Sequence, residues 1–185
     1  CGGVTLHSFF QMPFGPLIPE SHSQSRHKFN RKKIDIIKSL DLLVIDEISM
    51  VRADLLDGID SVLRRYRRSN SAFGGVQLLL IGDLHQLAQV ARADDWRLLR
   101  AYYDSPYFFS SRSLAETELL TIELRQIYRQ EDNDFIDLLN RVRDNRLDAG
   151  TLKKLNGRYR EDADTLDDSG YITLCSHNHR ADTIN

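Results

Sequence analysis

The sequence predicts an α/β fold in which helices flank a parallel β-sheet. Two short apolar runs, residues 42–45 and 77–81, have the length and aliphatic content of buried strands. Between them, residues 54–68 place apolar side chains on one face of a helix: Leu55, Leu56, Ile59, Val62, Leu63 and Tyr66. A strand, a helix and a second strand of these lengths form a βαβ unit, whose two strands run parallel.

The first predicted strand ends in two adjacent acids, Asp46 and Glu47. Its wholly aliphatic composition is typical of a strand that is covered on both faces. Open α/β sheets bind their ligands at the carboxyl ends of the strands. In a nucleotide-hydrolysing protein, the first acid would hold Mg²⁺ and the second would position or deprotonate the attacking water. The alternative is a strand that ends in two solvated carboxylates.

The second predicted strand also ends in polar residues, in the motif Gly82-Asp83-x-x-Gln86. Gly82 permits a tight exit from the sheet, and the amide of Gln86 can both donate and accept a hydrogen bond. Such an amide suits a γ-phosphate or an attacking water. We therefore expect Asp46, Glu47, Asp83 and Gln86 to lie along one rim of the sheet. Taken alone, this second motif is more often a polar turn.

Four segments follow one another in the order found in superfamily 1 DNA helicases, and they most resemble the RecD/Pif-like group. They are residues 4–10, 46–50, 82–87 and 128–130, which are similar to motifs Ia, II, III and IV. The resemblance runs from Gly2 to about Arg143. It implies a RecA-like fold of the P-loop NTPase type, here lacking the P-loop strand. It also implies a motor domain 1A in residues 1–148, followed in residues 149–185 by a linker helix and the start of motor domain 2A.

The resemblance assigns roles in ATP hydrolysis, with ATP and Mg²⁺ as cofactors. Asp46 is similar to the Mg²⁺-holding acid and Glu47 to the catalytic base. Asp83 and Gln86 match nucleotide-contacting positions, and Gln86 would sense the γ-phosphate. Arg129 matches an arginine that reaches the γ-phosphate from the far side of the cleft, where its planar fork would stabilise the transition state. The alternative for Arg129 is an exposed arginine with a solvent salt bridge.

The resemblance also implies single-stranded or forked DNA as the partner, with movement from 5′ to 3′. Thr5, His7 and Ser8 match a segment that touches the single strand. Phe9 is a candidate for stacking on unpaired bases, and we expect at least one residue of the Phe9–Phe10 pair to be buried. Lysines of a basic stretch would contact phosphates, or would form a solvated face instead. That stretch comprises Arg26, His27, Lys28, Arg31, Lys32, Lys33 and Lys38, with Lys28 and Lys32 as the chosen candidates.

No Gly-x-x-x-x-Gly-Lys-[Ser/Thr] loop occurs in the chain, which contains no Gly-Lys pair at all. That loop supplies the backbone N–H groups and the lysine that hold nucleotide phosphates. We therefore expect an internal piece of a longer helicase, inactive by itself. The alternatives are a degenerate DNA- or protein-binding domain without hydrolysis, and another α/β NTPase such as a remodelling or transport ATPase.

Composition is that of an ordinary globular domain, with 41% hydrophobic and 28% charged residues and a net charge of −2. No apolar run is long enough to cross a membrane. Two cysteines favour a reducing intracellular setting, either cytoplasmic and nucleoid-associated as in prokaryotes or elsewhere in the cell. We expect a monomeric motor. Cys175, His177 and His179 would share one side of a strand, but they lack a fourth ligand for zinc.

The second half of the chain is predicted to be mostly scaffold. A helix from about Trp96 to Tyr103 would pack on the sheet, and residues 119–124 would form a strand that leads to Arg129. Asp132 or Asn133 would cap the next helix. Residues 172–174 would form a further strand, and residues 161–170 an acidic connection.

Overall fold

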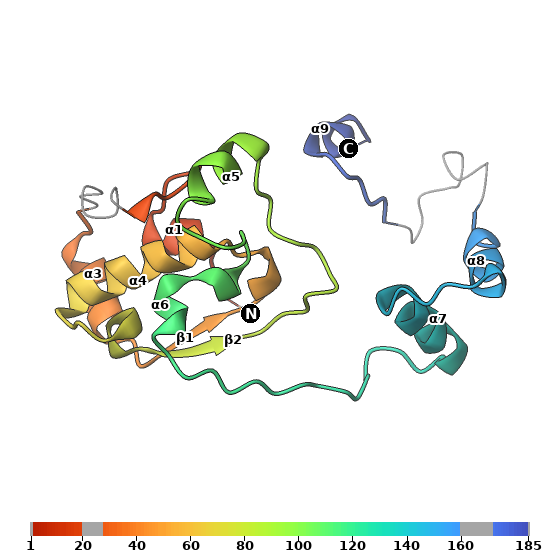
Figure 1. Ribbon diagram of the computed structural model, residues 1–185, viewed down its shortest axis with the longest axis horizontal. Coiled ribbons are helices and arrows are strands. Elements are labelled where there is room, and N and C mark those ends of the chain that lie inside the picture. The colour runs from red at the N-terminus through yellow and green to blue at the C-terminus, as the bar shows by residue number, and fades with distance from the viewer. Residues whose placement is uncertain (1, 20–27, 160–171, 185) are drawn as a thin grey trace. The chain divides into compact units, whose positions relative to one another are not determined.

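The computed structural model describes residues 2–19, 28–159 and 172–184. It divides into two compact units, Cys1–Leu124 and Arg125–Asn185, and each is described by itself. The first unit contains α1 (Leu6–Phe10), α3 (Arg31–Lys38), β1 (Leu42–Ile45), the 3-10 turn η1 (Ile48–Met50), α4 (Ala53–Arg67), the 3-10 turn η2 (Ala72–Gly75), β2 (Gln77–Leu80), α5 (Ala93–Leu99), the 3-10 turn η3 (Phe108–Ser110) and α6 (Arg112–Ala115). The second contains α7 (Asn133–Arg143), α8 (Ala149–Asn156) and α9 (Asn178–Ile184) (Figure 1).

The predicted βαβ unit is confirmed. β1 and β2 pair in parallel, with Leu42 opposite Gln77 and Ile45 opposite Leu80. The crossover between them contains α4, which begins and ends within one residue of the predicted helix. Because the strands are parallel and in register, both carboxyl ends lie at the same edge of the sheet.

The expectation that the first strand is covered on both faces is wrong for the described residues. Leu42 keeps 45% and Val44 keeps 49% of its surface exposed, whereas Ile45 is 2% exposed. Leu79, opposite Val44 in the register, is also 47% exposed. One face of the two-stranded sheet therefore packs on the described core, and the described residues leave the other face open.

The core of the first unit is built around α4. Its residues Leu56, Ile59 and Leu63 have no exposed surface, which confirms the apolar face predicted from their spacing. They share one hydrophobic cluster with buried residues from α1, α3, β1 and η2, including Phe10, Ile37, Ile45 and Phe73. Burying large apolar side chains in this way contributes about 1.5–3 kcal/mol each.

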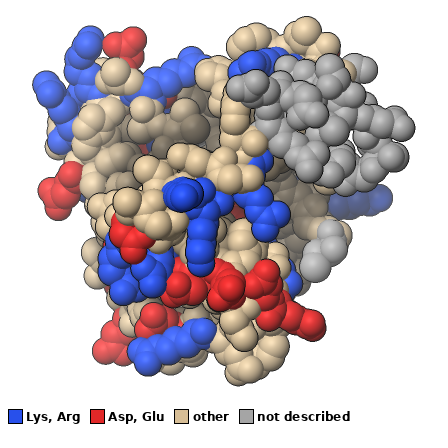
Figure 2. Space-filling view, turned by 90° about the vertical axis from the view of Figure 1, so that its right-hand side faces the viewer, with Lys and Arg blue, Asp and Glu red and all other residues tan. Residues whose placement is uncertain are grey.

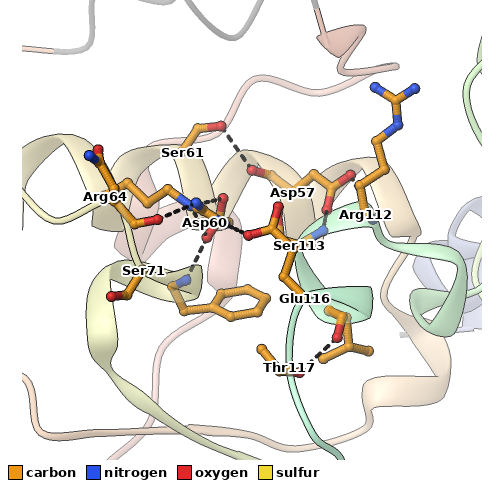
Figure 3. Close-up of polar contacts among 12 residues, drawn as sticks. Asp57, Asp60, Ser61, Arg64, Ser71, Arg112, Ser113, Glu116 and Thr117 are labelled. Atoms are coloured by element: carbon orange, nitrogen blue, oxygen red, sulfur yellow. Dashed lines mark hydrogen bonds and ion pairs between the residues drawn. The ribbon is translucent and has the colours of Figure 1, made fainter.

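Two buried acids on α4 hold neighbouring segments in place (Figure 3). Asp57 accepts hydrogen bonds from the Oγ of Ser111 at 2.5 Å and from the backbone N–H of Ser113 at 3.0 Å. Asp60 accepts from the backbone N–H of Phe73 at 2.5 Å, and its carboxylate also binds the Arg64 guanidinium. These carboxylates satisfy donors at the start of α6 and in η2 that would otherwise be buried without partners.

Later elements agree only in part with the predictions. Asp132 caps α7 by accepting from the backbone N–H of Phe135, as one of the two predicted caps would. α5 ends at Leu99, earlier than predicted, and Leu99 forms a small buried cluster with Ala53 of α4 and with Tyr103, which follows the helix. The N–H groups of Tyr102 and Tyr103 donate to the Leu99 carbonyl at 2.9 and 3.1 Å, which closes a turn directly after the helix.

Two predicted strands are absent from the described part of the chain. Residues 119–124 are extended but pair with no described strand, and Leu120 and Leu124 are 87% and 86% exposed. Residues 172–174 are likewise unpaired, with Leu174 92% exposed. Apolar composition predicted a strand in both places, but a strand also requires a partner for its backbone groups. The predicted acidic connection at residues 161–170 lies outside the described residues.

The two-unit division falls earlier than the domain boundary predicted after residue 148. α7 and α8 lie in the same unit, and Arg141 of α7 pairs with Asp148, the cap of α8, at 3.1 Å. The limit between motor domains 1A and 2A therefore stays a prediction.

Within the described ranges, every helix is too short or too polar to cross a bilayer. Basic and acidic side chains both occur on the face shown in Figure 2, in keeping with the small net charge of −2. Any attraction for nucleic acid must therefore be local.

Candidate functional site

The segments that follow β1 and β2 are joined backbone to backbone. The N–H of Ile81 donates to the carbonyl of Ile45 at 2.9 Å, and the N–H of Ile48 donates to the carbonyl of Ile81 at 2.9 Å. Asp46 and Glu47 lie between these two bonds on one segment, and Gly82 follows Ile81 on the other. The structure thus brings the acids of the first motif beside the start of the second.

Glu47 adopts an unusual backbone conformation at this edge. Its φ of 52° and ψ of 45° lie in the left-handed region, which residues with a Cβ seldom occupy. The Oδ1 of Asp46 accepts a hydrogen bond from the N–H of Glu47 at 2.9 Å, which supports this turn. The chain then enters η1, and both acidic side chains remain exposed. Strained residues of this kind persist where the surroundings hold them, often at functional sites.

Gly82 is required here for space. A Cβ at this position would lie 2.9 Å from Cγ2 of Ile48 and 3.0 Å from the Ile48 backbone nitrogen. Its φ is not in the positive range, so the close approach of the two segments is the reason for glycine. The sequence predicts a tight exit from the sheet at Gly82, and the structure shows that the chain passes close to Ile48 at this point.

The loop after β2 is organised by Asp83. Its Oδ1 accepts from the N–H of His85 at 3.0 Å, and its Oδ2 accepts from Nε2 of Gln86 at 3.3 Å. The backbone N–H of Gln86 also donates to the Asp83 carbonyl at 3.1 Å. Asp83 and Gln86 are therefore neighbours on an exposed loop at the carboxyl end of β2.

The donor atoms at this edge fit a magnesium ion bound with a phosphate ligand. Asp46, Glu47 and Asp83 supply carboxylate oxygens, the hard ligands that Mg²⁺ prefers. Among the residues that the structure describes, no three His, Cys, Asp or Glu side chains converge into a site made of protein ligands alone. Mg²⁺ is usually held by one or two carboxylates together with substrate phosphates, so this donor set is adequate.

A groove of about 440 Å³ opens in the first unit. It lies between the segment that contains α1, the end of η1, the start of α4 and the residues that precede and begin α5. Its lining consists of His7, Pro13, Phe14, Gly15, Leu17, Met50, Arg52, Leu55, Val90, Arg92 and Asp95. Among the predicted DNA-binding residues, His7 lines this groove.

Two groove residues have properties that suit a nucleic acid. The Phe14 ring stacks on the His7 ring, with centroids 5.3 Å apart and planes inclined by 15°, yet Phe14 remains 92% exposed. The Arg92 side chain is exposed, and its guanidinium makes no hydrogen bond or ion pair with any described residue. Neither residue was predicted. An aromatic residue between Pro13 and Gly15, in a loop, was the available signal for the first.

The other residues of the segment that is similar to motif Ia differ in their burial and in their contacts. Thr5 caps α1 by accepting from the N–H of Ser8 at 3.2 Å, while Ser8 is exposed. Phe10 is fully buried, which confirms that at least one of the paired phenylalanines belongs to the core. The Nζ of Lys33 lies 3.2 Å from the ring centroid of Phe9, so one face of Phe9 is already covered. Burial lowers the pKa of Lys33 below its usual value.

Other predicted site residues are exposed or lie elsewhere in the chain. Lys28 and Lys32 are exposed beside the buried Phe29, and Arg26 and His27 lie outside the described residues. Arg129 is exposed and belongs to the second unit. Its role stays a prediction.

The prediction that Cys175, His177 and His179 share one side of a strand is wrong for the described structure. Cys175 does not follow a strand, and His179 lies in α9. The rings of His177 and His179 are nevertheless 5.5 Å apart.

Comparison with known proteins identifies similar chains. The family model described as PIF1-like helicase matches residues 1–153. The chain is 35% identical over 161 residues to the ATP-dependent DNA helicase RRM3 of Saccharomyces cerevisiae, covering 84% of this chain and 21% of that protein. It is 31% identical over 191 residues to the ATP-dependent DNA helicase Pif1 of Campylobacter jejuni, covering 100% of this chain and 40% of that protein.

A solved structure is also similar. A Bacteroides Pif1 helicase crystallised with ADP-AlF3 and ssDNA has a TM-score of 0.91 and 38% identity, covering 99% of this chain and 42% of that chain. The chain therefore spans less than half the length of each of these relatives.

Proposed function

The chain belongs to the PIF1-like helicase family, and from this premise we propose that the whole protein couples ATP hydrolysis to movement along single-stranded or forked DNA. The observation that carries the proposal is the shared edge of β1 and β2, where Ile48 and Ile81 join the two polar motifs. The proposal includes movement from 5′ to 3′ along the strand. It also includes an intracellular location, where ATP and DNA occur together.

Each residue at the edge has a defined task in this proposal. Asp46 would hold Mg²⁺, which when bound would neutralise the charge of the phosphate oxygens. Glu47 accepts a proton from the attacking water, and its exposed carboxylate follows a left-handed turn that the Asp46 side chain supports. Gln86 hydrogen-bonds the γ-phosphate or the water. For Arg129, which belongs to the second unit, the proposal rests on the resemblance alone: it would add positive charge, a contribution worth about 10³–10⁵ in rate for arginines in this role.

The groove beside His7 is the proposed path for the DNA strand. The ring of Phe14 offers an exposed face for stacking on a base, and Arg92 offers a guanidinium that is free to meet a phosphate. Lys28 and Lys32 would add phosphate contacts that do not depend on sequence, so binding should weaken as salt concentration rises.

Glu47→Gln in the full-length protein tests the proposed catalytic base. Glutamine keeps the size of the side chain but cannot accept the proton, so ATP hydrolysis in the presence of an oligo-dT strand should fall by about 10² or more. Hydrolysis is measured by phosphate release, and DNA binding by fluorescence anisotropy should be retained.

The matched control is Glu118→Gln, because Glu118 is exposed and distant in sequence from both motifs. This control should hydrolyse ATP at the rate of the unmodified protein. Hydrolysis by Glu47→Gln at that same rate would contradict the assignment of Glu47 and the ATPase mechanism proposed for this edge.

A further inference from the structure

Arg52 is the centre of a partly buried network at the base of the groove. Its Nε donates to Oδ1 of Asp54 at 2.8 Å, and its Nη2 donates to Oδ2 of the same carboxylate at 2.7 Å. The side chains of Arg52 and Asp54 are only 14% and 1% exposed. This bidentate geometry, with two parallel N–H···O hydrogen bonds, is the strong form of an arginine–carboxylate contact.

The pair reaches both walls of the groove. On one wall, Nη2 of Arg52 donates to the carbonyl of Gly15 at 2.7 Å, and Oδ2 of Asp54 accepts from the N–H of Leu17 at 2.8 Å. On the other wall, Nη1 of Arg52 lies 3.5 Å from Oδ2 of Asp95 in α5. The loop that carries Phe14 is thus tied at Gly15 and at Leu17, directly after the exposed ring.

Arg52 is poorly suited to binding a phosphate itself. Its donors already face Asp54, Gly15 and Asp95, and the carboxylate of Asp54 compensates its charge. Hydrogen bonding to Asp54 raises the pKa of the guanidinium above its usual value, so it stays protonated. Arg92 lines the same groove, but its guanidinium is exposed and has no partner among the described residues, so it is the better candidate to bind a phosphate.

We infer that Arg52 and Asp54 are positioning residues for DNA, which hold the Phe14 loop in the orientation that forms the groove. The inference rests on the proposed function, because it assumes that the groove takes a single strand. Arg52 also directly follows the segment that contains Glu47 and η1. The shape of the DNA groove and the catalytic turn are therefore built on one continuous stretch of backbone.

The test is Arg52→Ala in the full-length protein, with a fluorescein-labelled oligo-dT strand as the probe. Affinity should fall about tenfold, the effect of losing one strong charge-assisted contact that orders a loop. The oligo-dT concentration for half-maximal ATP hydrolysis should rise by about the same factor, with a smaller change in the rate at saturating DNA. Arg52→Lys keeps the charge without the fork and should give an intermediate loss.

Arg64→Ala is the matched control, because Arg64 makes an equivalent network away from the groove. It binds the buried Asp60, the carbonyl of Asn70 at 2.6 Å and Glu116 at 2.7 Å. Its removal should lower the melting temperature, as removal of Arg52 should, but leave oligo-dT affinity unchanged. A selective loss of affinity in the Arg52 variants therefore separates positioning from general stability.

Four results would contradict the inference or the function on which it rests. Unchanged affinity in Arg52→Ala would overturn the inference, and so would equal losses in the Arg52 and Arg64 variants. If Arg52→Ala does not fold, the same comparison is made with Arg52→Lys, where affinity equal to that of the unmodified protein would overturn it. Failure of the unmodified protein to bind oligo-dT would instead overturn the proposed function, and this inference with it.

Discussion

An aromatic ring in solvent forgoes the free energy of burial, and Phe14 keeps 92% of its surface exposed. The neighbouring Phe10 is fully buried, and Phe9 has one ring face against Lys33. At the scale of single residues, three phenylalanines close in sequence thus have three different environments. Of the three, Phe14 has the ring most available to a ligand.

Phe14→Ala should weaken binding of oligo-dT by the full-length protein by about 1–3 kcal/mol, because stacking on one base would be lost. Fluorescence anisotropy titration at fixed salt measures the change. The control is Phe109→Ala, since Phe109 is 52% exposed and stacks on Tyr107, yet does not line the groove. Equal affinities for the Phe14 and Phe109 variants would exclude Phe14 as a stacking platform.

At the scale of elements, the site depends on two segments that approach too closely for a side chain between them. The contact is made at Gly82, where a Cβ would meet the backbone of Ile48. The hydrogen bond from Ile48 to Ile81 closes the same contact. Strands β1 and β2 alone would leave the two polar motifs near each other, but this contact sets their relative position.

Gly82→Ala should lower the free energy of unfolding by about 1–3 kcal/mol, since the added methyl group forces the two segments apart. Urea unfolding followed by circular dichroism measures the loss. Gly3→Ala is the control, because a Cβ at Gly3 has no atom within 4 Å. Equal stability of both variants would show that the segments can separate without cost, and the close approach would then have no structural importance.

At the scale of the whole molecule, the chain holds the acids and the amide of the proposed ATPase site but no Gly-Lys phosphate loop. That loop provides most of the hydrogen bonds to a bound triphosphate. The 185-residue chain by itself is therefore expected neither to bind ATP tightly nor to unwind DNA. Isothermal titration with ATP and a fluorescent unwinding assay on a forked duplex check these two expectations.

A substantial rate of ATP hydrolysis by the isolated chain, lost in Glu47→Gln, would contradict this expectation. A rate that persists in Glu47→Gln would point to a contaminating ATPase. The comparison of the two proteins therefore decides whether the edge of the sheet can act without a separate phosphate loop.

The success of sequence-based prediction differed between elements for a physical reason. β1, β2 and α4 were predicted because their apolar periodicity and their polar ends are local properties. The strands expected at residues 119–124 and 172–174 were wrong for the described structure, since pairing depends on a partner elsewhere in the chain. Within the proposed site, local motifs suggested the acids and Gln86, whereas no motif suggested Phe14 or Arg92, and the roles of all these residues stay predictions.

The sequence by itself determined the family, the order of the motifs and the parallel βαβ unit, because these depend on residue type and spacing. Only the tertiary structure decided which residues meet at the groove. Arg52 and Asp54 contact Gly15 and Leu17 across separations of 37 residues. No local pattern encodes such contacts, since they arise from the packing of the loop on the start of α4.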